Sequence, residues 1–272
     1  MQTYNDIANA VFDFLLAPFG HDWFLFDLIL WPLLLGVGAI IVYKYTSNQK
    51  GIESAKRQLS MHLLEIRLFR DDLLQVLKST LLIVLKNPIY IGHNLVPMAV
   101  MIVPMVGVMV QLVAHYGYEP SPPGSTELLR VVLDPGGAIT AADVSLKLPP
   151  GILLDAPPVR TADGQVFWRL TAVEAGDHVL QIKVGDETLE KGWAVGGEAR
   201  KIPVMRLRSW EALLYPGEPV IPSSSPVQSI ELAVHTRPLA YLPDGEFGIL
   251  MWFFVLSMAA GFALKDFFGV TL

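Results

Sequence analysis

Histidines and carboxylates are the side chains of this sequence that could do chemistry, and one pair of them has a suggestive spacing. His62 and Glu65 stand three residues apart, which puts both on one face of a helix, as in di-metal helical bundles. Those sites also need carboxylates from other helices, and the sequence holds no second His–Glu pair at this spacing. We therefore expect a solvated or interfacial helix face here, and the sequence predicts no metal ligand.

The remaining candidates for catalysis or cofactor binding lie near the edges of apolar segments. His93 and His115 flank one such segment, whereas a haem or chlorophyll ligand normally lies deeper in the membrane. Asp27 lies near the interior of another, and such carboxylates are functional candidates by default. Because Asp27 is within one or two turns of the segment's end, we expect it to be solvated or hydrogen-bonded. The sequence has no cysteine, Gly-x-Ser-x-Gly elbow or Walker loop, so it predicts no enzyme, no catalytic residue and no cofactor.

The composition is typical of a membrane protein. Hydrophobic residues make up 52% of the 272 residues and charged residues only 17%, whereas soluble proteins carry about 25% charged residues. Three apolar stretches, 23–43, 95–115 and 247–264, approach the roughly 20 residues that a helix needs to cross a bilayer. The net charge of −6 argues against a nucleic-acid partner, because such proteins need a basic surface.

The distribution of basic residues predicts the orientation of these spans. Residues 44–94 hold eight basic and four acidic side chains, whereas residues 1–43 hold no Lys or Arg. Since cytoplasmic loops are enriched in basic residues, we expect 44–94 to be cytoplasmic and the N-terminus to be outside. Residues 115–246 are then outside and the tail 265–272 is cytoplasmic. These expectations describe a bacterial inner-membrane protein whose main domain is periplasmic.

The N-terminal region 1–22 contains an amphipathic stretch, Asn5–Ala17, in which Ile7, Val11 and Phe14 share one helical face. We expect it to form a helix that lies on the outer membrane–water interface. A flexible tail is the alternative.

The cytoplasmic segment predicts a helical hairpin. An amphipathic helix is expected over 52–69, and a second, largely apolar helix over 73–85, with Asp71 or Asp72 as its N-cap. Asn87–Pro88 is expected to end the second helix, because proline cannot continue the hydrogen-bond ladder.

Residues 119–208 are rich in Pro and Gly and predict an external antiparallel β-sandwich, so the fold class is an α + β membrane protein. The expected strands have alternating or β-branched residues: 128–133, 143–148, 166–172, 178–184, 189–195 and 230–235. Gly176–Asp177 is expected to join the third and fourth of these as a hairpin. Residues 209–226 are expected to be a Pro/Ser-rich linker, and 227–246 the last strand and the return to the third span.

The stretch 157–197 resembles bacterial immunoglobulin-like domains. The residues that carry the resemblance are Val166–Leu170, Glu174–His178 and the strand that follows to Gly185. The resemblance implies an immunoglobulin-like fold and a binding module.

The order of spans, hairpin and external insert resembles the core of the YidC/Oxa-type insertase superfamily, and also a group of uncharacterised bacterial three-span membrane proteins. The carrying segments are Ser54–Arg57, His62–Phe69, Tyr116–Tyr118 and Gly261–Lys265. The resemblance to insertases implies a basic residue in a membrane groove that attracts the substrate. The three spans contain no Lys or Arg, so this sequence departs from that pattern.

The sequence therefore favours a non-catalytic structural or accessory subunit of a larger bacterial membrane complex, of respiratory or photosynthetic type. Its expected partners are other integral membrane subunits, the lipid bilayer and a periplasmic protein at the β-sandwich. The expected contact residues are aromatic or small: Trp23, Trp31, Gly36, Gly38, Phe69, Trp210, Tyr215 and Trp252. The alternative is an Oxa/YidC-like insertase or assembly chaperone.

Overall fold

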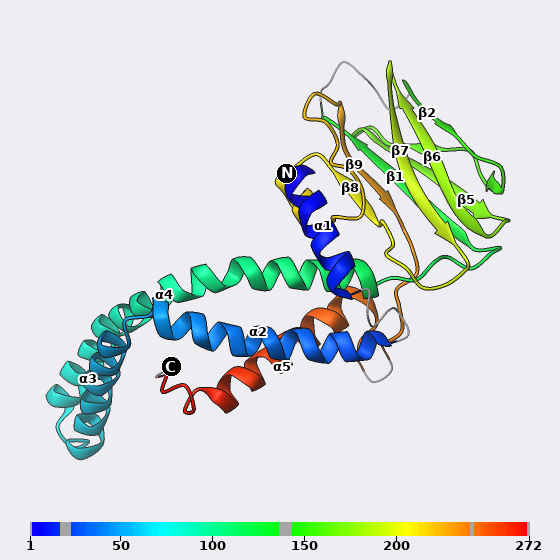
Figure 1. Cartoon of the computed structure of the whole chain (residues 1–272). Coiled ribbons are helices and arrows are strands. Elements are labelled where there is room, and N and C mark those ends of the chain that lie inside the picture. The colour runs from blue at the N-terminus through cyan, green and yellow to red at the C-terminus, as the bar shows by residue number, and fades with distance from the viewer. Residues whose placement is uncertain (1, 17–22, 136–142, 240–241, 271–272) are drawn as a thin grey trace. The chain divides into compact units, whose positions relative to one another are not determined.

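A computed structural model of the chain describes residues 2–16, 23–135, 143–239 and 242–270. Figure 1 shows the helices and strands of the chain. By their internal contacts the residues divide into two compact units. The first comprises Met1–Leu28 and Val108–Trp252, and the second comprises Ile29–Gly107 and Phe253–Leu272. Ala17, the expected end of the N-terminal helix, lies outside the described residues, and so does the side chain of His93.

Among the described residues, three helices are long and apolar enough to cross a membrane. They are α2 (Phe24–Thr46), the part of α4 from Leu95 to Tyr116, and α5 (Gly245–Leu264). Their bounds agree with the predicted spans to within three residues. Each helix is apolar around its whole circumference, which is typical of helices surrounded by lipid or protein rather than water.

A helical hairpin connects α2 to the apolar part of α4. Helix α3 (Gln49–Leu68) is followed by a short turn, and α4 then begins at Leu73. The expected N-cap is confirmed as Asp72, whose Oδ1 accepts hydrogen bonds from the backbone N–H groups of Leu74 and Gln75.

The predicted helix end at Asn87–Pro88 is wrong, because α4 runs continuously from Leu73 to Tyr116 through Pro88, Pro97 and Pro104. A proline removes its own N–H bond and displaces one carbonyl, which can bend a helix without ending it. The turns on both sides of Pro88 keep their own hydrogen bonds, so the helix resumes.

The first unit contains two antiparallel sheets. The larger has the order β3 (Ile152–Leu154), β5 (Gln165–Ala172), β1 (Thr126–Leu133), β9 (Val227–Leu232) and β8 (Met205–Leu207), with β4 (Val159–Arg160) also paired to β5. The smaller has the order β2 (Val144–Lys147), β6 (Gly176–Val184) and β7 (Glu187–Val195). Buried residues of both sheets form one apolar core, which includes Trp168, Leu180 and Trp193. The six predicted strands are confirmed, with shifted ends, and β3, β4 and β8 were missed.

The predicted hairpin between residues 166–172 and 178–184 is wrong. Strand β5 pairs with β1 and β3, whereas β6 pairs with β2 and β7, so the chain changes sheet between them. Alternation of apolar residues tells which face of a strand is buried but not which strand lies beside it. The observed hairpin is β6–β7, in which Val184 is the register partner of Glu187.

Candidate docking surfaces

The N-terminal helix α1 (Gln2–Leu16) docks on the first unit through its polar side. The Asn5 and Asn9 amides donate hydrogen bonds to the carbonyls of Ala212 and Pro216, at 3.1 and 2.8 Å. The backbone N–H of Val220 donates to the Gln2 side chain at 2.7 Å. Gln2, Asn5 and Asn9 are three and four residues apart, so they form one polar stripe along α1. This stripe contacts the segment 197–220, which we call the arm.

The same polar stripe also holds α1 against the last turns of α4. The Gln111 amide donates to Asn9 at 3.1 Å, and the buried His115 ring hydrogen-bonds Asp13 at 2.9 Å. Lys201, from the arm, donates to Asn9 at 2.7 Å, and burial lowers the pKa of this ammonium group. Helix α1 is therefore fixed beside the end of an apolar helix.

The apolar side of α1 faces away from the unit. Tyr4, Ile7, Val11, Phe14 and Leu15 are exposed, with Phe14 reaching 78%. A surface helix normally buries its apolar face and exposes its polar one. Helix α1 has the opposite arrangement, so its outer face needs an apolar environment.

A buried ion pair holds the arm 197–220, to which α1 is hydrogen-bonded, in place. The Lys191 ammonium, with a fully buried side chain, donates to Glu218 at 2.6 Å and to the Pro203 carbonyl at 2.8 Å. Desolvation by burial lowers the pKa of Lys191, and the charge of Glu218 opposes that shift. The second Glu218 oxygen accepts the Gly192 N–H, so the arm is fixed to β7 by both charge and backbone.

The expected aromatic contacts of the arm have different surroundings. The 3₁₀ helix η3 (Trp210–Leu214) carries Trp210, which is 65% exposed and free to meet a partner. Tyr215 is half-buried and lines a small cavity of about 20 Å³ with Val113 and Ile202. Trp210 therefore remains a candidate contact, whereas Tyr215 is largely packed against its own unit.

Asp27 was expected to be solvated or hydrogen-bonded, and the structure shows it hydrogen-bonded. Its side chain is buried, and the Tyr116 hydroxyl donates to it. Nearby, the buried Arg237 guanidinium lies 5.1 Å from the centre of the Phe24 ring and 3.5 Å from Glu119. These polar groups join the start of α2 to the end of α4 and to the segment after β9. Trp23, one residue before Phe24, is 66% exposed.

In the second unit, the hairpin of α3 and α4 is joined by a small polar cluster. The Lys86 ammonium donates to His62 Nε2 at 3.2 Å, and His62 Nδ1–H donates to Glu65 at 2.9 Å. The Ser79 hydroxyl donates to the same Glu65 oxygen at 2.7 Å. The hydrogen bonds from His62 and Ser79 lower the pKa of Glu65. Across the described parts of the chain, no three His, Asp or Glu side chains are grouped so as to hold a metal ion.

The outside of this hairpin carries a large exposed apolar surface, which we call the leucine surface. It comprises Leu64, Leu68, Leu73, Leu74, Leu77, Leu81 and Leu85, each between 56% and 83% exposed. Phe69, an expected contact residue, lies at the turn and is 47% exposed. Monomeric soluble proteins rarely expose apolar patches of this extent, and such patches mark interaction sites.

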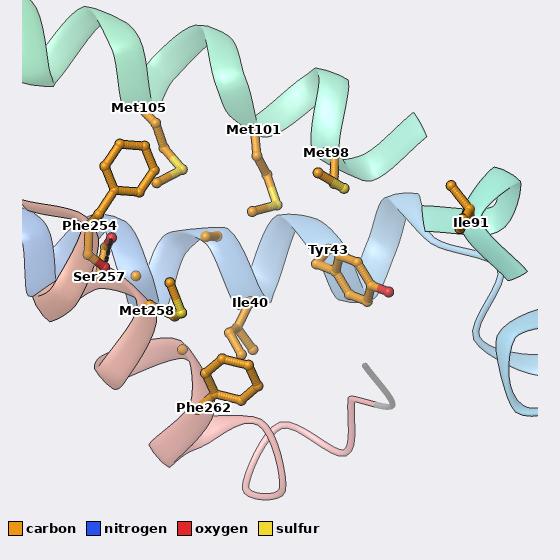
Figure 2. A pocket seen from close by; sticks show the side chains of 13 residues that line it. Ile40, Tyr43, Ile91, Met98, Met101, Met105, Phe254, Ser257, Met258 and Phe262 are labelled. Atoms are coloured by element: carbon orange, nitrogen blue, oxygen red, sulfur yellow. Dashed lines mark hydrogen bonds between the residues drawn. The ribbon is translucent and has the colours of Figure 1, made fainter. Parts of the chain in front are cut away.

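The apolar helices of the second unit enclose a groove with a volume of about 570 Å³. Met98, Met101 and Met105 project into it from α4, and Phe254, Met258 and Phe262 line it from α5 (Figure 2). Helix α2 contributes Gly36, Ala39, Ile40 and Tyr43. None of the lining residues that the structure describes has a charged side chain. The methionine row was missed at the level of sequence, although its spacing of three and four residues could have revealed it.

Gly36 and Gly38, the two small residues of α2 that were expected to contact a partner, have different surroundings. A Cβ at Gly36 would collide with the backbone oxygen of Ser257 and lie 2.9 Å from the Ala260 Cβ, so Gly36 allows α2 and α5 to pack closely. A Cβ at Gly38 meets nothing within 4 Å, so its surface is open. Trp31 and Trp252 are half-buried and do not line the groove.

Comparisons with known proteins add no family. No family model matches the chain, and no curated protein matches it. Two solved structures match in part: domains 4 and 5 of the S-layer protein SbsC, at 13% identity, and its fragment rSbsC(31–844), at 15%. Both alignments cover 30% of this chain with a TM-score of 0.25, and they span 48% and 12% of those chains. Scores this low carry no argument about fold or function.

Proposed function

We propose that this protein is a non-catalytic accessory subunit that binds other subunits of a larger bacterial membrane complex. In this proposal α2, α4 and α5 cross the inner membrane, the two sheets form an immunoglobulin-like sandwich in the periplasm, and the α3–α4 hairpin lies in the cytoplasm. The length and apolar composition of the three helices support the crossing. The excess of basic residues in 44–94 supports the orientation.

The observation that carries the proposal is the leucine surface. Leu73, Leu74 and Leu77 are 83%, 80% and 67% exposed at the start of α4, where a hairpin in water would place polar residues. The cluster of His62, Glu65, Ser79 and Lys86 ties α3 to α4 on their shared side. Leu73, Leu77, Leu81 and Leu85 recur every four residues, so they lie on one face of α4. A partner protein that covers them would gain the free energy of burying that area.

The second candidate function is that of an insertase or assembly chaperone, and the methionine-lined groove favours it. Flexible, polarisable methionine side chains suit surfaces that accept varied apolar segments. Met98, Met101 and Met105 form such a row. The described part of the groove lining holds no Lys or Arg of the kind that the resemblance to insertases implies, which is why we rank this candidate second.

The two candidates can be separated by gentle detergent extraction of the full chain from native membranes, followed by size separation and mass spectrometry. The paired change Leu74→Glu and Leu77→Glu should abolish co-migration with a defined set of membrane subunits. Leu153→Glu, on the exposed face of β3 where Leu153 is 58% exposed, provides the control and should retain co-migration. Co-migration unaffected by the paired change would contradict the proposal. Association with ribosomes and many unrelated nascent chains would favour the insertase candidate.

A further inference from the structure

The groove of the second unit has the dimensions of a lipid-chain site. From Ile91 to Met105 the lining follows α4 over 14 residue steps, or about 21 Å at the rise of an α-helix. The walls from α2 (36–43) and α5 (254–262) are about 11 and 12 Å long, so the groove is elongated along α4. An extended hydrocarbon chain matches this elongated shape.

The chemistry of the lining selects for a hydrocarbon. Its polar side chains are Ser257 and Tyr43, and the Ser257 hydroxyl already donates to the Phe254 carbonyl at 3.2 Å. The small residues Gly36, Ala39 and Gly261 leave the space. Methionine and phenylalanine side chains form the walls (Figure 2). Volumes of about 300–1,000 Å³ are usual for small-ligand sites, and this one lies within that range.

We propose that the groove between α2, α4 and α5 binds one linear hydrocarbon chain of a membrane lipid. The headgroup stays outside, because none of the described side chains that line the groove carries a charge to hold it. The inference rests on the proposed membrane crossing but not on the identity of any protein partner. A chain held here would fill the space next to the Gly36 contact and support the packing of α2 on α5.

The two faces of α4 allow a direct test. Met98, Met101 and Met105 line the groove, whereas Val100, Ile102 and Val103 are 47%, 54% and 68% exposed and lie outside it. The full-length protein is placed in nanodiscs of dioleoylphosphatidylcholine that contain a small fraction of phosphatidylcholine with a diazirine on one acyl chain. After irradiation, mass spectrometry locates the labelled residues. We expect labelling on the methionine face to exceed that on the valine–isoleucine face several-fold.

Two adjacent small residues of α2 provide matched variants. Ala39→Trp fills the groove and should reduce labelling of Met101 several-fold, whereas Gly38→Trp points into open space and should leave it unchanged. Met105→Trp fills the groove from α4 and repeats the test if Ala39→Trp fails to fold. Equal labelling of both faces, or unchanged labelling in both filling variants, would overturn the proposal. A defined protein crosslinked at Met101 in natively extracted material would also overturn it.

Failure of the membrane crossing gives a different result from failure of the site. If the helices do not enter the bilayer, the diazirine reaches neither the methionine face nor Val100, Ile102 and Val103. If they enter it but the groove holds no chain, the outer face is labelled and the methionine face is not. The first result contradicts the crossing, and the second contradicts the lipid site alone.

Discussion

Removing one member of the buried Lys191–Glu218 pair should loosen the arm that carries α1. In Glu218→Gln the Lys191 ammonium keeps the Pro203 carbonyl at 2.8 Å but loses the carboxylate at 2.6 Å. An unpaired buried charge of this kind costs about 3–5 kcal/mol. That is a large part of the 5–15 kcal/mol by which proteins are typically stable.

The double variant Lys191→Met with Glu218→Gln should be more stable than Glu218→Gln alone. Methionine fills the fully buried path of the lysine stem without a charge, and the glutamine oxygen still accepts the Gly192 N–H. Replacing a buried ion pair by groups of similar volume is often close to neutral, so we expect a net loss of about 1 kcal/mol. Measuring the single variant Lys191→Met as well completes the double-mutant cycle, which gives the coupling free energy between the two residues.

The assay is thermal unfolding of the full-length protein in detergent, followed by tryptophan fluorescence. Trp168 and Trp193 are buried in the core that the two sheets share, so their emission reports on this unit. A loss of 1 kcal/mol lowers the melting temperature of proteins of 150–250 residues by about 2–4 °C, so Glu218→Gln should melt about 10 °C lower. Hydrogen exchange should rise in the arm 197–220 and in α1. If the double variant is no more stable than Glu218→Gln, the reasoning about the unpaired charge is refuted.

Three further predictions follow from individual contacts. Hydrogen bonds from Arg208 lower the pKa of Asp134 from 3.8 to about 2. The stability that this carboxylate contributes is therefore present above its unfolded pKa and is lost as the pH falls from about 4 to 2. Compared with the wild type, Asp134→Asn should have a lower melting temperature at neutral pH and a smaller decrease between about pH 4 and pH 2. Gly36→Leu should weaken the packing of α2 on α5 by about 1–3 kcal/mol, whereas Gly38→Leu should melt like the wild type; equal melting of the two would contradict the close contact. Lipids with brominated chains should remove more emission from Phe14→Trp than from the wild type, whose six tryptophans give the baseline; an equal loss in both would show that the exposed row of α1 does not meet the bilayer.

The parts of the fold that could be predicted from sequence depend on local pattern. The three apolar helices follow from length and composition, and α3 follows from its amphipathic repeat. The cap at Asp72 follows from residue type at a helix start. Each of these features depends on residues that are close together in the sequence, so a single chain suffices to recognise it.

The errors concern interactions between distant residues. The alternation in β5 and β6 is the same whether the strands pair with each other or lie in separate sheets, so it could not exclude the predicted hairpin. The continuation of α4 past Pro88 depends on whether the turns on each side are supported, which residue type does not reveal. For the candidate surfaces, the sequence named Gly36 and Trp210 but not the groove, because a cavity exists only where three helices meet.

The partners of the polar stripe of α1 were the least accessible feature of all. The sequence predicted an amphipathic helix at the membrane–water interface, but it did not indicate what the polar stripe would contact. The structure satisfies Asn5, Asn9 and Asp13 with partners from the arm and from α4. Those partners are brought together by the sheets and the ion pair at Lys191, so nothing within residues 2–16 specifies them.

The buried charges of the first unit explain what this arrangement is for. Lys191 with Glu218, Arg237 with Glu119, and His115 with Asp13 each join segments that are distant in the sequence. Buried pairs of this kind are weak evidence for stability, and replacing them by apolar groups is often harmless. Each pair is therefore better understood as selecting one position for the segments that it joins. Lys191 with Glu218 and His115 with Asp13 position the arm and α1, whereas Arg237 with Glu119 joins the segments that follow β9 and α4. The result is an exposed apolar row fixed beside the end of α4. These buried Lys, Arg and His side chains thus hold distant segments together, and a fixed apolar row is what the proposed accessory subunit would need to meet a partner or the bilayer.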